Sequence, residues 1–220
     1  MPQADGLSGG TKAERVLLYA GFDIWRYGRT GYGGFYWAPD GLNNDGFITR
    51  LFVSRGVERH DAGAARSSTD IVRVSPLAGW RFKQGTLELK VFAGPELENR
   101  TATPDVAAAK LRGTYFGARA AAELWWEPMP EMMLTSAFSA STNAASHSAR
   151  AAAGRRVLDR FWAGPEISVS RDEFSAQYRM GAHLTGFTLD ALEWSVAAGY
   201  VTDSYHRNGI YGRIGVLTRQ

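Results

Sequence analysis

Residues 72–97 read VRVSPLAGWRFKQGTLELKVFAGPEL, with apolar side chains at almost every second position on both sides of Gln84-Gly85. The positions between them carry mainly Arg, Lys, Glu, Ser and Gly. Strict alternation of this kind indicates a β-strand with two unlike faces. The Gln-Gly pair supplies the tight turn of a hairpin. The stretch therefore predicts two long antiparallel strands, at 70–83 and 86–98.

The same alternation recurs along the whole chain, in segments longer than the five or six residues that are typical of soluble strands. Membrane-spanning strands need about nine to eleven residues, and bacterial outer-membrane barrels have an even number of strands. We therefore predict an all-β fold, an up-and-down antiparallel transmembrane β-barrel of about twelve strands over residues 15–220, after an N-terminal tail at 1–14. The predicted strands are 15–27, 31–38, 46–57, 70–83, 86–98, 113–127, 131–142, 147–156, 159–170, 174–187, 190–202 and 208–218.

The connections between these strands test the barrel topology. With the N-terminus in the periplasm, the long polar loops predicted at 58–69 and 99–112 are extracellular, as expected of outer-membrane barrels. The first two connections break the rule, because 29–30 is short and 39–45 is long. A soluble β-barrel or sandwich has the same alternation and stays open as the alternative fold.

Composition narrows the cellular setting. The formal net charge is +3 with basic residues scattered singly, so nucleic acid is not an expected partner. There is no cysteine, which excludes disulfides and thiolate metal sites, and no apolar run is long enough for a membrane-spanning helix. The start, MPQADGLSGGTKAER, lacks the apolar core of a secretory signal. The protein is then either cytoplasmic or exported with its signal peptide removed. The strand pattern favours the second, an exported protein of the cell outer membrane in contact with outer-membrane lipid.

The tetrapeptide AGPE occurs twice, at 93–96 and 163–166, inside two of the predicted strands. Proline cannot donate a ladder hydrogen bond, so it is unusual within a strand. Both copies have the same register, with proline on the apolar face and glutamate on the polar face. We interpret the two copies as a degenerate repeat that makes a bend near the outer rim, where glycine permits close backbone approach.

The polar faces of the strands are predicted to line the lumen. Acidic and basic residues alternate on neighbouring strands, so they can pair across the ladder. We expect a structural charge network, with ion or ligand selectivity as the alternative. The predicted lumen charge network comprises Asp23, Arg73, Arg81, Glu96, Arg119, Glu123, Arg150, Glu166, Arg179, His183 and Glu193.

Aromatic residues gather near the predicted strand ends, as they do in the interfacial girdles of membrane barrels. Trp25, Tyr32, Tyr36 and Trp37 are candidates for exposed rim residues that stack on sugar faces, although anchoring at the membrane interface explains them equally well.

Catalytic and metal chemistry has little support. His147 and Ser148 are adjacent in a strand and point to opposite faces, so they cannot act as base and nucleophile. His183 with Ser168 or Thr185 remains the other combination. Residues 40–46, DGLNNDG, resemble a calcium loop in composition but lack its bidentate glutamate, which favours a plain turn. We expect no catalytic residues, no metal and no cofactor.

The stretch GFDIWRYGRTGYGGFYWAPDGLNNDGFITRLFVSRG (residues 21–56) resembles the start of the cellulose biosynthesis protein BcsS family of alphaproteobacteria. Four later stretches are also similar to that family, namely the later AGPE strand, Met180–Leu184, Ala198–Tyr200 and Tyr211–Arg213. The resemblance implies a non-enzymatic outer-membrane accessory of cellulose or exopolysaccharide biosynthesis and secretion, with glucan chains or other secretion components as partners. A small-solute, porin-like channel and a lipid-modifying outer-membrane enzyme are the alternative functions.

Overall fold

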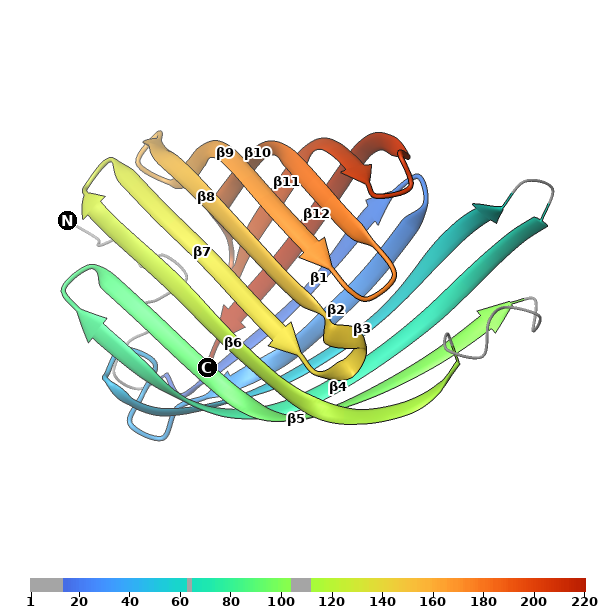
Figure 1. Ribbon diagram of the computed structural model, residues 1–220. Coiled ribbons are helices and arrows are strands. Elements are labelled where there is room, and N and C mark those ends of the chain that lie inside the picture. The colour runs from blue at the N-terminus through green and yellow to red at the C-terminus, as the bar shows by residue number, and fades with distance from the viewer. Residues whose placement is uncertain (1–13, 63–64, 104–111) are drawn as a thin grey trace.

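The computed structural model describes residues 14–62, 65–103 and 112–220, which form a closed antiparallel barrel (Figure 1). Each strand pairs with the next along the chain, and β1 closes the barrel against β12. This confirms the predicted up-and-down barrel of twelve strands. The strands are β1 Val16–Trp25, β2 Gly28–Trp37, β3 Gly46–Ala62, β4 Ala65–Gln84, β5 Leu87–Thr103, β6 Gly113–Met129, β7 Met132–Ser141, β8 His147–Val157, β9 Phe161–Arg171, β10 Ala176–Leu189, β11 Leu192–Asp203 and β12 Asn208–Arg219.

The two ends of the barrel differ. We call the end that carries Arg15, Gln220 and the turn at 38–45 the terminal end, and the opposite end the open end. At the terminal end the backbone N–H groups of Arg15 and Val16 both donate to the carbonyl of Gln220. At the open end β3 to β6 extend well past the other strands (Figure 1).

This extension corrects one prediction. The polar segment 58–69, expected to be an extracellular loop, is mostly strand, because β3 runs to Ala62 and β4 starts at Ala65. The backbone ladder continues there, from Glu58 opposite Thr69 to Ala62 opposite Ala65, without needing an apolar face. The predicted loop at 99–112 begins as strand, since β5 reaches Thr103, and 104–111 lie outside the described residues. The predicted tail at 1–14 lies outside them too, except for Glu14.

The barrel is apolar outside and polar inside, the reverse of a soluble protein. Leu18, Phe22 and Ile24 of β1 are exposed, whereas the charged side chains of Arg81, Glu96 and Glu166 are buried. Outward-facing tryptophans gather towards the terminal end, where Trp80 in β4 is 47% exposed. An apolar outer band edged by aromatic side chains is typical of membrane barrels and unfavourable in water. In the described part of the chain, no helix has the length and apolarity to span a membrane.

The first AGPE segment lies in the middle of β5, and the second lies in the half of β9 nearer the terminal end. Neither lies near the outer rim at the open end, so that part of the prediction is wrong. A Cβ atom on Gly164 would lie 2.0 Å from the carbonyl oxygen of Ala153, and one on Gly94 would lie 2.3 Å from that of Pro76. The regular pairing of β4 with β5 is interrupted between Val74–Leu97 and Ala78–Ala93, with the register unchanged. Glycine therefore lets the neighbouring strand come close where proline interrupts the ladder.

We predict that Gly164→Ala destabilises the barrel by about 1–3 kcal/mol, the usual cost of overpacking, because the clash is with backbone that cannot move aside. The measurement is the denaturant midpoint of the refolded barrel, followed by heat-modifiable gel migration. Gly212→Ala is the matched control, since its Cβ would meet only Ile24 Cγ2, at 3.9 Å. Equal midpoints for the two variants would contradict the prediction.

Candidate functional site

A layer of apolar side chains closes the lumen at the terminal end. Leu42, from the turn at 38–45, is 3% exposed and packs among inward-facing residues of several strands. Beside this layer lies a crevice of only about 10 Å³, roughly the room of one water molecule. We call this layer the plug. It consists of Leu17, Tyr36, Ala38, Leu42, Ile48, Leu77, Phe92, Ala121 and Leu217.

Arg81 on β4 hydrogen-bonds to the turn at 38–45 and so holds the plug against the barrel wall. The guanidinium is 2% exposed, and its Nε donates to the carbonyl of Asn44 at 2.9 Å. Its two Nη atoms donate to the carbonyls of Gly41 and Leu42. The turn that resembles a calcium loop in composition therefore directs three of its carbonyls at the Arg81 guanidinium, and not at a metal ion.

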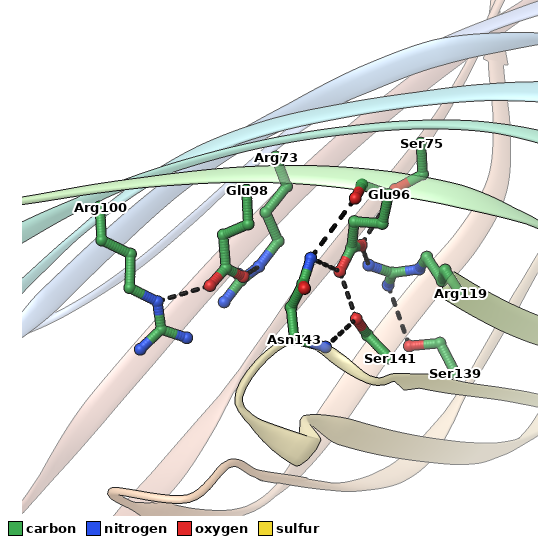
Figure 2. Close-up of polar contacts among 9 residues, drawn as sticks. All are labelled: Arg73, Ser75, Glu96, Glu98, Arg100, Arg119, Ser139, Ser141 and Asn143. Atoms are coloured by element: carbon green, nitrogen blue, oxygen red, sulfur yellow. Dashed lines mark hydrogen bonds and ion pairs between the residues drawn. The ribbon is translucent and has the colours of Figure 1, made fainter. Parts of the chain in front are cut away.

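Glu96, from the first AGPE segment, is the centre of one polar cluster in the lumen (Figure 2). Its carboxylate is 1% exposed and accepts hydrogen bonds from Arg119 Nη1 at 2.7 Å, from Ser75 Oγ at 3.0 Å and from Ser141 Oγ. Asn143 Nδ2 also donates to it, at 3.4 Å. These donors come from β4, β6, β7 and the following turn, so one carboxylate ties together four parts of the barrel.

Glu98, two residues further along β5, repeats this arrangement nearer the open end (Figure 2). It is 0% exposed and accepts from Arg73 Nε and Arg100 Nε, each at 2.5 Å.

Glu166, from the second AGPE segment, is the centre of a second polar cluster, which is based on β9. Its carboxylate is 2% exposed, pairs with Arg213 at 2.5 Å and Arg150 at 3.2 Å, and accepts from the Tyr211 hydroxyl at 3.1 Å. Arg213 and Tyr211 lie on β12, three strands away from β9, so these contacts run across the lumen and not along the ladder.

The second AGPE segment also explains the position of His183. The register of β8 against β9 sets Ala153 opposite Pro165, which has no N–H to donate. His183 lies opposite Gly164, and its Nε2 lies 3.1 Å from the carbonyl oxygen of Ala153. With no side chain on Gly164, the imidazole reaches the carbonyl that proline leaves without a partner.

The remaining predicted lumen residues are also placed inside and paired. Glu123 meets Arg50 Nη1 at 2.8 Å and the Tyr36 hydroxyl at 2.8 Å. Asp23 pairs with Arg179 across the lumen, and Glu193 pairs with Arg219 at 3.1 Å. Three ion pairs of the structure join members of the predicted set, namely Asp23–Arg179, Glu96–Arg119 and Arg150–Glu166. The other five members have partners outside that set, and they are Arg73, Arg81, Glu123, His183 and Glu193.

The rim aromatics are mostly not on the rim. Trp25 is 9% exposed and Tyr36 is 8% exposed, and both point into the lumen, so the expectation of exposed stacking surfaces is wrong for them. Tyr32 also points inward, with its ring over Gly21. Trp37 faces outward and is 42% exposed, as an interface anchor requires. Register decides the difference, since Tyr36 and Trp37 are neighbours on one strand and must face opposite sides.

A cavity of about 230 Å³ opens at the open end of the barrel. The arginines of its inner wall already have carboxylate partners, namely Arg73 with Glu98, Arg119 with Glu96, Arg179 with Asp23 and Arg207 with Asp203. The side chains between them are hydroxyls and an amide. Its inner wall includes Asp23, Trp25, Arg73, Arg119, Ser139, Ser141, Ser148, Ser170, Gln177, Arg179, Asp203 and Arg207.

Among the histidines whose side chains the structure describes, no hydrogen bond joins an accessible imidazole to a side-chain hydroxyl. His183 Nδ1 lies 3.0 Å from Thr185 Oγ1, but both residues are 3% exposed and the other imidazole nitrogen contacts a backbone carbonyl. His147 Nδ1 contacts the carbonyl of Ala145 at 3.2 Å. Among the described residues, no group of three or more His, Asp or Glu side chains is arranged to hold a metal ion.

A family model for the cellulose biosynthesis protein BcsS matches residues 17–220, nearly the whole described barrel. The chain belongs to the BcsS family. Among curated proteins, none is similar enough in sequence to count as a match. The family is one of accessories to cellulose biosynthesis, and the described part of this BcsS-family chain has no evident catalytic group.

Solved structures show the same fold at low sequence identity. LpxR from Salmonella typhimurium superimposes with a TM-score of 0.54 and 10% identity over 92% of this chain and 99% of that one. The KdgM porin gives 0.53 and 10% over 92% and 98%. The translocator domain of the autotransporter NalP from Neisseria meningitidis gives 0.52 and 15% over 96% and 90%. The BcsS-family barrel therefore has the fold of outer-membrane proteins.

Several polar residues of this BcsS-family lumen were missed by sequence reasoning. Glu98 is the last residue of the predicted strand 86–98, and Arg100 falls where a loop was expected, although both continue the alternation that places Glu96 inside. Asp203 and Arg207 flank a tight turn and form an ion pair at 2.6 Å, which a strand pattern does not reveal. Extending the alternation beyond Glu96 would have predicted Glu98 and Arg100 on the inner face, whereas no sequence pattern predicts the Asp203–Arg207 pair.

We predict that Glu166→Gln destabilises the folded barrel by about 3–5 kcal/mol, because it leaves Arg150 and Arg213 without their shared buried counter-ion. The measurement is the denaturant midpoint of the refolded protein. Asp70→Asn is the control, since it breaks an ion pair in which Arg55 is 72% exposed, and such pairs contribute little. A Glu166→Gln midpoint as high as that of the control would show that the cluster does not stabilise the barrel.

Proposed function

We propose that this BcsS-family protein is a non-enzymatic outer-membrane accessory of cellulose or exopolysaccharide biosynthesis and secretion, acting by binding and not by conducting the polymer. The observation that carries the proposal is the filled lumen of a chain whose family belongs to cellulose biosynthesis. We infer that the protein sits in the outer membrane with its apolar outer band in contact with lipid.

A conduit for a glucan chain needs a continuous aqueous path through the barrel. In this chain the plug closes the terminal end, and the Glu96 and Glu166 clusters occupy the middle. Opening a path would separate buried ion pairs, which is costly because the charges would lose their partners. The same argument disfavours the small-solute channel, and the likeness to the KdgM porin concerns the fold alone.

With the N-terminus in the periplasm, the open end and the extended β3–β6 sheet face the outside of the cell. An accessory placed there can hold or guide polymer that another component exports. The partners we infer are outer-membrane lipid and glucan chains or other components of the secretion system.

Deleting the gene in a cellulose-producing host is predicted to lower the amount of cellulose retained at the cell surface while the glucan synthase activity of isolated inner membranes stays unchanged. The two quantities are measured by dye binding on whole cells and by incorporation of labelled sugar nucleotide in membrane fractions. Complementation with the wild-type gene is the control. Unaltered surface cellulose, with the protein demonstrably present in the parent outer membrane, would contradict the proposal.

We predict that the purified wild-type barrel shows no ion conductance in planar lipid bilayers, because the plug and the charge clusters fill its lumen. Combining Arg81→Ala with Leu42→Ser releases the turn at 38–45 and is expected to raise the frequency of brief conducting events above wild type, while the Glu96 and Glu166 clusters in the middle still prevent steady conductance. Arg73→Ala is the control, because Arg73 is on β4 like Arg81 but lies beside the open cavity and far from the plug. This variant should show no more conducting events than the wild-type protein. Steady conductance from the wild-type protein would favour the porin-like alternative.

A further inference from the structure

We propose that the cavity at the open end binds the end of a neutral, hydroxyl-rich oligosaccharide, such as a short segment of β-glucan. The choice of a sugar as ligand rests on the proposed function, whereas the preference for a neutral ligand rests on the cavity itself. The site is the inner wall formed by β7 to β11 together with Trp25 on the opposite side.

A row of hydrogen-bonding side chains crosses this wall at one level. Ser139 is opposite Ser148, Ser148 is opposite Ser170, Ser170 is opposite Gln177, and Gln177 is opposite Asp203. Neighbouring strands are about 4.8 Å apart, so the row offers a hydrogen-bonding group at regular short intervals around the wall. Each hydroxyl both donates and accepts, as sugar hydroxyls do, and the Gln177 amide adds two donors and an acceptor.

The row is held in place from below. Ser139 Oγ accepts from Arg119 Nη2 at 3.0 Å and lies 3.0 Å from Ser148 Oγ. Arg119 is itself fixed on Glu96 (Figure 2), and Gln177 accepts from Arg179 Nε at 2.8 Å. The binding groups are therefore preorganised by the charge network, which lowers the entropic cost of binding.

The charge balance of the cavity favours a neutral ligand over an acidic one. Arg179 and Arg207 are occupied by Asp23 and Asp203, and Arg119 by Glu96. Arg29 and Arg171 also line the cavity, but they lie at its rim, because Arg29 is opposite the outward-facing Ile24 and Arg171 is on the same face of β9 as the outward-facing Ile167. An anionic sugar would have to displace these carboxylates from their arginines and would be repelled by them. A neutral sugar can accept from the remaining guanidinium N–H groups and donate to the carboxylates without breaking any pair.

The size and the far wall fit the end of a chain. At about 230 Å³ the cavity is smaller than the roughly 300–1,000 Å³ of typical small-molecule pockets, and the Arg119–Glu96 and Arg179–Asp23 pairs lie at its base. Trp25 and Tyr27 supply its aromatic side, their rings packed edge to face at 5.3 Å. The Arg207 guanidinium lies over both rings, 5.6 Å from the Trp25 centroid and 4.8 Å from the Tyr27 centroid. A pyranose ring therefore meets this guanidinium and the ring edges on this side, while its hydroxyls meet the serine row.

The test uses the full chain refolded in detergent, with cellotetraose as the neutral probe and tetragalacturonate as the acidic probe, both followed by isothermal titration calorimetry. We expect binding of cellotetraose that is at least about tenfold weaker in Ser170→Ala/Gln177→Ala, since two hydrogen-bonding groups are removed. Ser168→Ala is the matched control, because Ser168 lies on the same face of β9 as Ser170, one step below the cavity, and should bind as wild type does. Heat-modifiable migration verifies that each variant is folded.

Tighter binding of tetragalacturonate than of cellotetraose would overturn the neutral preference. Binding of neither probe by the folded protein, or equal weakening by Ser168→Ala and by the double variant, would overturn the site. These results leave the proposed function to its own test, because a deletion strain that loses surface cellulose would still support an accessory role exercised through another surface. Normal surface cellulose together with cellotetraose binding would support the site and overturn the role in secretion.

Discussion

A buried carboxylate that must keep its cationic partners is the constraint on which the rest of the lumen depends. Glu96 and Glu166 are almost completely removed from solvent. The donors to Glu96 come from β4, β6 and β7, and those to Glu166 come from β8 and β12. An unpaired charge in such a place is far costlier than the modest net gain from pairing it. The clusters therefore fix which strands face each other across the barrel.

The AGPE motif is how the sequence places these carboxylates. Glycine has no side chain, which lets the backbone of the neighbouring strand come closer than a Cβ atom would allow. Proline lacks the N–H that would donate to the neighbouring strand, but the register stays unchanged. In the second copy the freed carbonyl of Ala153 is recovered by His183. The glutamate that follows points into the lumen from a segment whose neighbouring strand lies unusually close. A motif that looks unfavourable for a strand is thus used at mid-lumen, where the network needs support from adjacent strands.

The predictable part of this structure is the part set by local periodicity. Alternation alone placed the strand boundaries within three residues, except where β3, β4 and β5 continue at the open end. It also placed Asp23, Glu123 and His183 on the inner face. It could not foresee that Glu166 meets Arg213, because contacts across the lumen depend on the tilt and stagger of the closed barrel, which no single strand encodes. The extended sheet was missed because strands outside a lipid layer no longer need an apolar face.

The filled lumen and the balanced cavity are two consequences of one arrangement. Pairing Arg119 with Glu96 and Arg179 with Asp23 blocks passage through the barrel, and the same pairs form the base of the cavity and neutralise its arginines. If the lumen had to open, these pairs would separate and expose a strongly charged channel suited to ions. Because they stay closed, the cavity presents hydroxyls, an amide and satisfied charges. This arrangement is why we propose a neutral sugar, and not an ion, as the ligand of the open end.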